Sequence, residues 1–88
     1  MRVTIWDLDY YYAKDRRNSY SVDAMRISSF HKQSGDYVNF VRTEDDIRRP
    51  YDLYYIIKEK STTPNAPLDF YTNSKVRFWG KANKAHIT

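Results

Sequence analysis

The chain has 88 residues, which is room for one small domain, and its 41% hydrophobic and 17% aromatic content argues against intrinsic disorder. It has no cysteine, which excludes disulfides, thiolate catalysis and cysteine-held metals in these residues. The formal charge is +4, but acidic residues stand beside most basic ones, which favours a solvated surface over a phosphate-binding one. Without a transmembrane run or a signal peptide, the composition predicts a soluble cytoplasmic domain that contacts no membrane.

The first part of the chain predicts a strand, a loop and a helix. Residues 3–8 are β-branched and aromatic, which is typical of a buried or half-buried strand. Residues 9–20 are polar and rich in tyrosine without a clear period, so we expect a loop. Ser21 is a good N-cap and Gly35 suits a left-handed helix end, which predicts a helix over residues 21–34.

Three further strands are predicted at residues 36–41, 51–57 and 75–79. The run 51–57 is almost continuously apolar, which suits a central strand covered on both faces.

Two short helices are predicted between these strands. Thr43 and Asp46 have the spacing of a capping box, and Pro50 requires the helix that they open to be short. Residues 68–71 follow a proline and predict one or two helical turns. Residues 81–88 have no pattern and are expected to form a flexible tail, the junction to a further domain.

Strands that alternate with helices imply right-handed crossovers and a parallel sheet. Residues 1–80 are therefore predicted to form a single α/β domain. Its architecture would be a small open parallel sheet of about four strands, flavodoxin-like or Rossmann-like, in the order 2-1-3-4. The last strand would be an open edge, which indicates either a homodimer through that edge or a longer protein. We favour the longer protein.

Candidate ligand-binding residues follow from this topology. Open parallel sheets bind ligands beyond the carboxyl ends of their strands, at the point where the strand order reverses. The residues at those ends are Asp7, Asp9, Tyr10, Thr43, Lys58 and Gly80. We assign no catalytic residue and no metal ligand, because His31 and His86 lack the spacing of a zinc site. His31 is instead expected to be a hydrogen-bonded structural residue on the buried side of its helix.

Asp7 and Asp9 also suggest an enzyme. A hydrophobic strand followed by Asp-x-Asp resembles the first motif of haloacid dehalogenase-like phosphatases, where one carboxylate attacks phosphorus, the other handles the proton and both lie near magnesium. Tyr11 stands where that family has threonine or valine. The alternative is that an aspartate at the end of a first parallel strand serves in capping or in loop structure.

A nucleic-acid-binding module is another alternative. It would use Arg16, Arg17, Arg48, Arg49 and the tyrosines, although the interspersed acidic residues argue against it. The run Tyr10–Tyr12 could stack on a planar ligand or a base, or pack over the sheet edge or a partner domain.

Most of the chain resembles the N-terminal B12-binding-like domain of radical S-adenosylmethionine proteins. The resemblance is carried by the strand that runs into Asp7 and Asp9, and by residues 25–32, 35–40, 51–56 and 75–80. It implies an accessory domain without catalysis of its own, in contact with a downstream catalytic domain of the same chain. The iron-sulfur cluster and S-adenosylmethionine would belong to that downstream domain.

Cobalamin is the ligand that this resemblance implies. The DxHxxG motif that anchors cobalamin is absent, because no histidine follows Asp7 or Asp9 at that spacing. Bulky Tyr10, Tyr11 and Tyr12 stand where cobalamin needs room. We therefore expect no cofactor in this domain.

Overall fold

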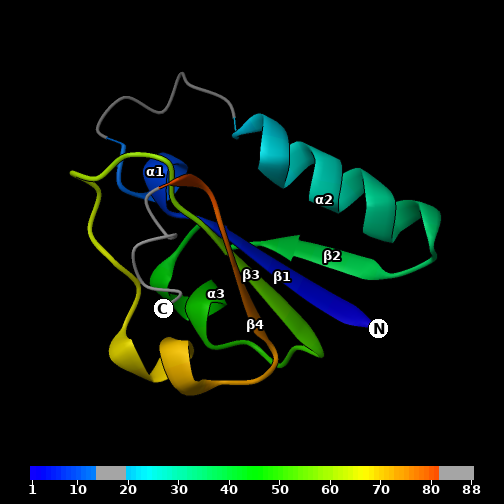
Figure 1. Ribbon diagram of the computed structural model, residues 1–88. Coiled ribbons are helices and arrows are strands. Elements are labelled where there is room, and N and C mark those ends of the chain that lie inside the picture. Colours follow the sequence, from blue (N-terminus) through cyan, green and yellow to red (C-terminus); the bar gives the residue numbers. More distant parts are fainter. Residues whose placement is uncertain (14–19, 82–88) are drawn as a thin grey trace.

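The computed structural model describes residues 1–13 and 20–81 (Figure 1). Four parallel strands form one sheet: β1 (Arg2–Asp7), β2 (Tyr37–Phe40), β3 (Leu53–Ile57) and β4 (Val76–Trp79). They lie in the order β2-β1-β3-β4, which confirms the predicted α/β fold and its 2-1-3-4 order. The basic pair Arg16–Arg17 and most of the predicted tail lie outside the described residues.

The longest helix is α2 (Val22–Gln33), and its ends are as predicted. The Ser21 hydroxyl accepts a hydrogen bond from the amide of Ala24 at 3.1 Å, which satisfies one free amide of the first turn. Beyond the other end, Gly35 has a φ of 84°, in the region that favours glycine. The two short helices predicted between the later strands are also present, as α3 (Glu44–Ile47) and the 3-10 helix η1 (Leu68–Thr72).

The segment after β1 differs from the prediction. Residues Leu8–Tyr11 form a short helix, α1, where a strand end and a loop were expected. Asp7 begins this helix, since its Oδ1 accepts a hydrogen bond from the amide of Tyr10 at 3.4 Å. A helix of one turn has no apolar period, so its only signal in the sequence is the cap residue.

The connections cover both faces of the sheet (Figure 1). On one face α2 packs on a cluster of buried residues made of Val3, Ile5, Ala24 and Ile57. On the other face α3 and η1 flank a second cluster made of Trp6, Leu8, Val41, Tyr54, Ile56, Ala66, Phe70 and Val76. Crossovers on opposite faces are what right-handed connections require when the strand order reverses between β1 and β3.

The two edges of the sheet are β2 and β4. Because α2 is centred on β1 and β2 in Figure 1, the same face of β4 lies beyond it. That part of the sheet carries Tyr55, Arg77 and Trp79, and Trp79 is 47% exposed. Among residues 1–13 and 20–81, none of the helices has the length and apolar character needed to cross a membrane.

His31 joins α2 to the sheet near the amino ends of the strands. Its Nδ1 lies 2.8 Å from Asp36 Oδ2 and its Nε2 lies 2.9 Å from the Tyr55 hydroxyl. An ionised carboxylate only accepts, so Nδ1 donates to Asp36, and in the neutral ring Nε2 accepts from Tyr55. His31 is 3% exposed. The predicted structural role of His31 is confirmed.

This cluster predicts acid sensitivity. Hydrogen bonds from the His31 ring and the Met1 ammonium group hold the pKa of the Asp36 carboxyl below its usual value. A lowered folded-state pKa means that this stabilisation is complete above about pH 4 and is lost as the pH falls through the folded-state pKa. We expect the difference in unfolding free energy between the wild type and Asp36→Asn to shrink as the pH falls below about 4. Urea denaturation across this range measures it, and a difference independent of pH would contradict it.

Candidate functional site

The predicted site residues lie at or near the carboxyl ends of the strands. We call this end of the sheet the carboxyl edge. Asp7 ends β1, while Asp9 and Tyr10 belong to α1. Lys58 directly follows β3, and Gly80 directly follows β4. Thr43 follows β2 after two intervening residues and precedes α3.

Asp7 is almost completely buried, at 2% exposure. Its Oδ2 accepts from the amide of Ser21 at 2.8 Å, while Oδ1 accepts from the amide of Tyr10. Burial raises the pKa of the Asp7 carboxyl, and the two amide hydrogen bonds oppose that rise. One carboxylate thus caps α1 and fixes the entrance to α2.

Asp9 connects the segments that follow β1 and β3. Its Oδ2 accepts from the amide of Glu59 at 2.7 Å, and its Oδ1 accepts from the amide of Lys60 at 3.3 Å. The Thr63 hydroxyl also donates to Oδ1, at 2.6 Å. Because the strand order reverses between β1 and β3, this bridge crosses the place where open parallel sheets bind ligands. In this structure Asp7 caps α1, and Asp9 braces the loops that follow β1 and β3.

Lys58 and Gly80 lie next to each other at the ends of β3 and β4. The Lys58 amide donates to the carbonyl of Trp79 at 3.0 Å. The Lys58 side chain is buried, and its Nζ donates to Asn65 Oδ1 at 2.5 Å. Gly80 has a φ of 98°, and a Cβ at this position would overlap the carbonyl oxygen of Lys58. Lys58 and Gly80 therefore hold the ends of β3 and β4 close together.

Tyr10 belongs to a row of aromatic rings. Its ring centroid lies 4.1 Å from that of Tyr20, which in turn lies 4.4 Å from that of Phe40. Tyr11 packs edge-on against Trp6 with 5.6 Å between ring centroids, whereas Tyr12 is 44% exposed. Two of the three adjacent tyrosines thus pack within the domain, over the end of β1.

Thr43 is hydrogen-bonded to Asp46 in the first turn of α3. Its amide and hydroxyl donate to Asp46 Oδ2 at 3.1 and 3.2 Å. The Arg42 amide donates to the same oxygen at 3.1 Å. These hydrogen bonds hold the Asp46 carboxyl at a pKa below its usual range. Thr43 therefore begins α3, as the capping-box spacing predicts.

No family model, no curated protein and no solved structure matches the chain. Within the described ranges, no group of three or more histidine, cysteine, aspartate or glutamate residues is placed to hold a metal ion.

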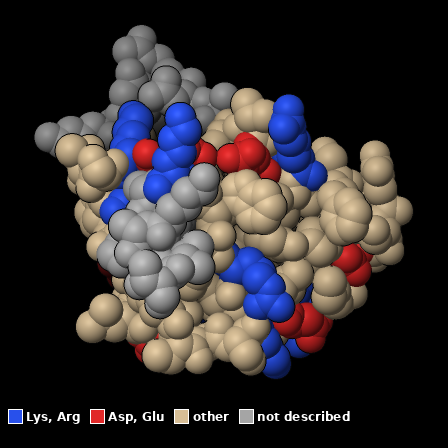
Figure 2. Space-filling model, in the orientation of Figure 1, with Lys and Arg blue, Asp and Glu red and all other residues tan. Residues whose placement is uncertain are grey.

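The surface charge is mixed, as the sequence predicts. Arg48 forms a two-pronged hydrogen-bonded pair with Asp69, at 2.6 and 3.1 Å. Arg49 Nε lies 2.9 Å from Asp46 Oδ1. Figure 2 shows acidic side chains close to basic ones on the visible face. Two of the four arginines named for nucleic-acid binding are therefore already paired with carboxylates.

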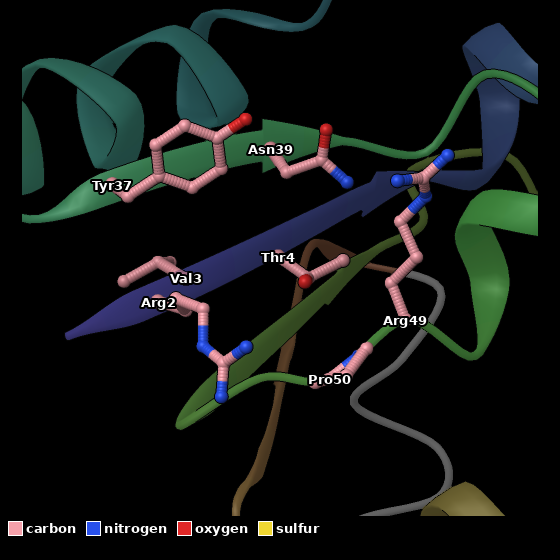
Figure 3. A pocket seen from close by; sticks show the side chains of 7 residues that line it. All are labelled: Arg2, Val3, Thr4, Tyr37, Asn39, Arg49 and Pro50. Carbon is pink, nitrogen blue, oxygen red and sulfur yellow. The ribbon is translucent and has the colours of Figure 1, made fainter.

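A pocket lies away from the carboxyl edge, where the sequence interpretation did not place one. It has a volume of about 210 Å³, and its lining residues are Arg2, Val3, Thr4, Tyr37, Asn39, Arg49 and Pro50 (Figure 3). The available signal was the alternation of polar residues at position 2, just before the first predicted strand, and at position 4 within it, and at 37 and 39 in the next strand. Alternate residues of a strand share a face, so this pattern indicates a polar patch on the sheet.

Proposed function

We propose that this chain is the accessory N-terminal domain of a radical S-adenosylmethionine protein, with a cobalamin-binding-like fold and no catalysis of its own. The sequence resemblance supports this assignment. The parallel sheet supports it as well, because 2-1-3-4 is the order found in flavodoxin-like sheets. The domain would act by contact with a downstream catalytic domain.

The observation that carries the proposal is the bridge made by Asp9. Its hydrogen bonds to Glu59, Lys60 and Thr63 hold the segments after β1 and β3 together at the switch point, the place where the strand order reverses. A ligand bound there would compete with these bonds for the same space. A carboxyl edge braced in this way suits contact with another domain better than it suits a ligand-binding crevice.

Cobalamin does not fit the residues at this edge. The chain after Asp7 turns directly into α1, and the rings of Tyr10 and Tyr11 pack on Tyr20 and Trp6. The described residues contain one histidine, His31. Both of its ring nitrogens are already hydrogen-bonded, to Asp36 and to Tyr55. We therefore place no cofactor in this domain and assign the iron-sulfur cluster and S-adenosylmethionine to the downstream domain.

The β4 edge adjoins the carboxyl ends of the strands at Gly80, and we assign both surfaces to the contact with the downstream domain. β4 is the last strand of the described chain and ends at Trp79, one residue before Gly80. Trp79 is exposed there and supplies an aromatic anchor of the kind enriched in protein contacts. A homodimer through the same edge is the competing arrangement, and the molecular mass of the chain in solution, measured by sedimentation, distinguishes the two.

Reading the coding sequence past Thr88 tests the proposal directly. We expect a Cys-x3-Cys-x2-Cys cluster, which would hold the iron-sulfur cluster of the catalytic domain. A stop codon directly after Thr88 would overturn the assignment.

The expected failure to bind cobalamin can be measured separately. When hydroxocobalamin is titrated with the chain, we expect its visible spectrum to stay unchanged, because His31 is buried and already bonded. The same titration with free imidazole provides the positive control. The His86→Gln variant removes the histidine outside the described residues, and a saturable spectral change with this variant would contradict the expectation.

A further inference from the structure

The pocket in Figure 3 is built on two neighbouring strands. The parallel register of β1 and β2 pairs Arg2 with Tyr37 and Thr4 with Asn39. The four side chains share one face of the sheet because each pair is two residues along from the other. Arg49 and Pro50, from the segment after α3, complete the wall. We call this site the Arg2–Arg49 pocket.

The pocket exists because one crossover is short. The connection from β2 to β3 runs over the face opposite α2, and its only helix in the described chain is α3, with four residues. A longer crossover helix would cover the amino half of β1 and β2. Instead, the part of the apolar cluster that β1 supplies begins at Trp6, and the polar residues before it on β1 and beside it on β2 remain next to a hollow of about 210 Å³.

The two charged side chains that line the pocket are both arginines. Among the described residues the Arg2 guanidinium has no ion-pair partner. Asp52 lies close to Arg2, but it accepts a hydrogen bond from the Arg2 backbone amide, at 2.7 Å. Arg49 uses Nε for Asp46, and its two terminal nitrogens make no hydrogen bond within the described part of the chain. None of the seven lining residues is acidic. The pocket therefore offers two guanidinium groups and has no carboxylate in its lining.

We propose that the Arg2–Arg49 pocket binds the phosphate group of a small phosphorylated molecule. In Figure 3 the two arginines stand on either side of Thr4, so an anion over Thr4 meets a guanidinium group from each side. A phosphate monoester has three free oxygens for such a pair, whereas the two oxygens of a carboxylate are satisfied by one guanidinium fork. Tyr37 is 68% exposed at the rim, which places an aromatic ring beside the ester group. This site does not depend on the proposed accessory function.

Amide shifts in nuclear magnetic resonance spectra test the proposal on the isotope-labelled chain. We expect inorganic phosphate, added at constant ionic strength, to shift the amides of Thr4 and Asn39 to saturation in the millimolar range. Phenyl phosphate should bind more tightly and also shift Tyr37, because its ring reaches the rim. Acetate at the same concentrations serves as the carboxylate probe and should bind more weakly.

Three arginine variants make the test specific. Arg2→Gln and Arg49→Gln should each weaken phosphate binding about tenfold, because each removes charge-assisted hydrogen bonds. Arg26→Gln, at an exposed position on α2, should leave it unchanged. Shifts that rise without saturating, acetate binding as tight as phosphate, or an equal loss in Arg26→Gln would overturn the proposal. Arg2→Gln retains the Arg49–Asp46 ion pair, so its result does not depend on that contact.

Discussion

Replacing Gly80 by alanine is expected to lower the free energy of unfolding by about 3 kcal/mol. The φ of 98° is strained for any residue with a Cβ, and the new Cβ would overlap the Lys58 carbonyl oxygen and lie 2.9 Å from its carbonyl carbon. That carbonyl belongs to the backbone at the end of β3, where the Lys58 amide is bonded to Trp79. Relief of the clash therefore requires the ends of β3 and β4 to separate. Urea denaturation measures the loss.

Gly35→Ala is the matched control for this substitution. Gly35 also has a positive φ, 84°, but a Cβ there would meet no atom within 4 Å. Only the backbone strain remains, so we expect a loss of about 1 kcal/mol. Equal losses in the two variants would show that the close approach of Gly80 to Lys58 does not affect the free energy of unfolding.

The helix α2 and the strand order could be predicted because their signals are local and redundant. Ser21 and Gly35 mark both ends of α2, and the alternation of strands and helices leaves few topologies for a parallel sheet. The buried face of α2 follows less directly from the sequence. The apolar residues Val22 and Met25 are 66% and 51% exposed, while Ala24, Ser28 and His31 are buried. A small sheet buries only a narrow stripe of the helix.

The candidate site shows where sequence interpretation stops. The residues at the carboxyl ends of the strands follow from topology, but their partners do not. Asp9 accepts hydrogen bonds from residues at least 50 positions away in the chain, and no local sequence pattern predicts such a contact. The Arg2–Arg49 pocket was missed for a different reason. It depends on two features of the β2–β3 connection. The shortness of α3 follows from Pro50, but the face of the sheet over which the connection runs requires the three-dimensional arrangement.

Removal of the Asp9 carboxylate should loosen the switch point. We expect Asp9→Ala to lower the free energy of unfolding by about 2 kcal/mol, because two backbone amides and one hydroxyl lose their acceptor. Exchange of the Glu59 and Lys60 amide hydrogens with solvent should accelerate at least about tenfold, since the loop after β3 is then held by fewer bonds. Hydrogen exchange read by nuclear magnetic resonance resolves the two amides.

Two further variants separate this bridge from a general effect of lost negative charge. Asp9→Asn keeps one acceptor oxygen and should lose about half as much stability as Asp9→Ala. Asp45→Ala removes an exposed carboxylate on α3 and should change stability by no more than about 0.5 kcal/mol. If Asp9→Ala resembled Asp45→Ala in both stability and amide exchange, the bridge would not hold the two loops together. The carboxyl edge would then be free to open for a ligand, and the case for an accessory domain without a ligand-binding crevice would lose its main support.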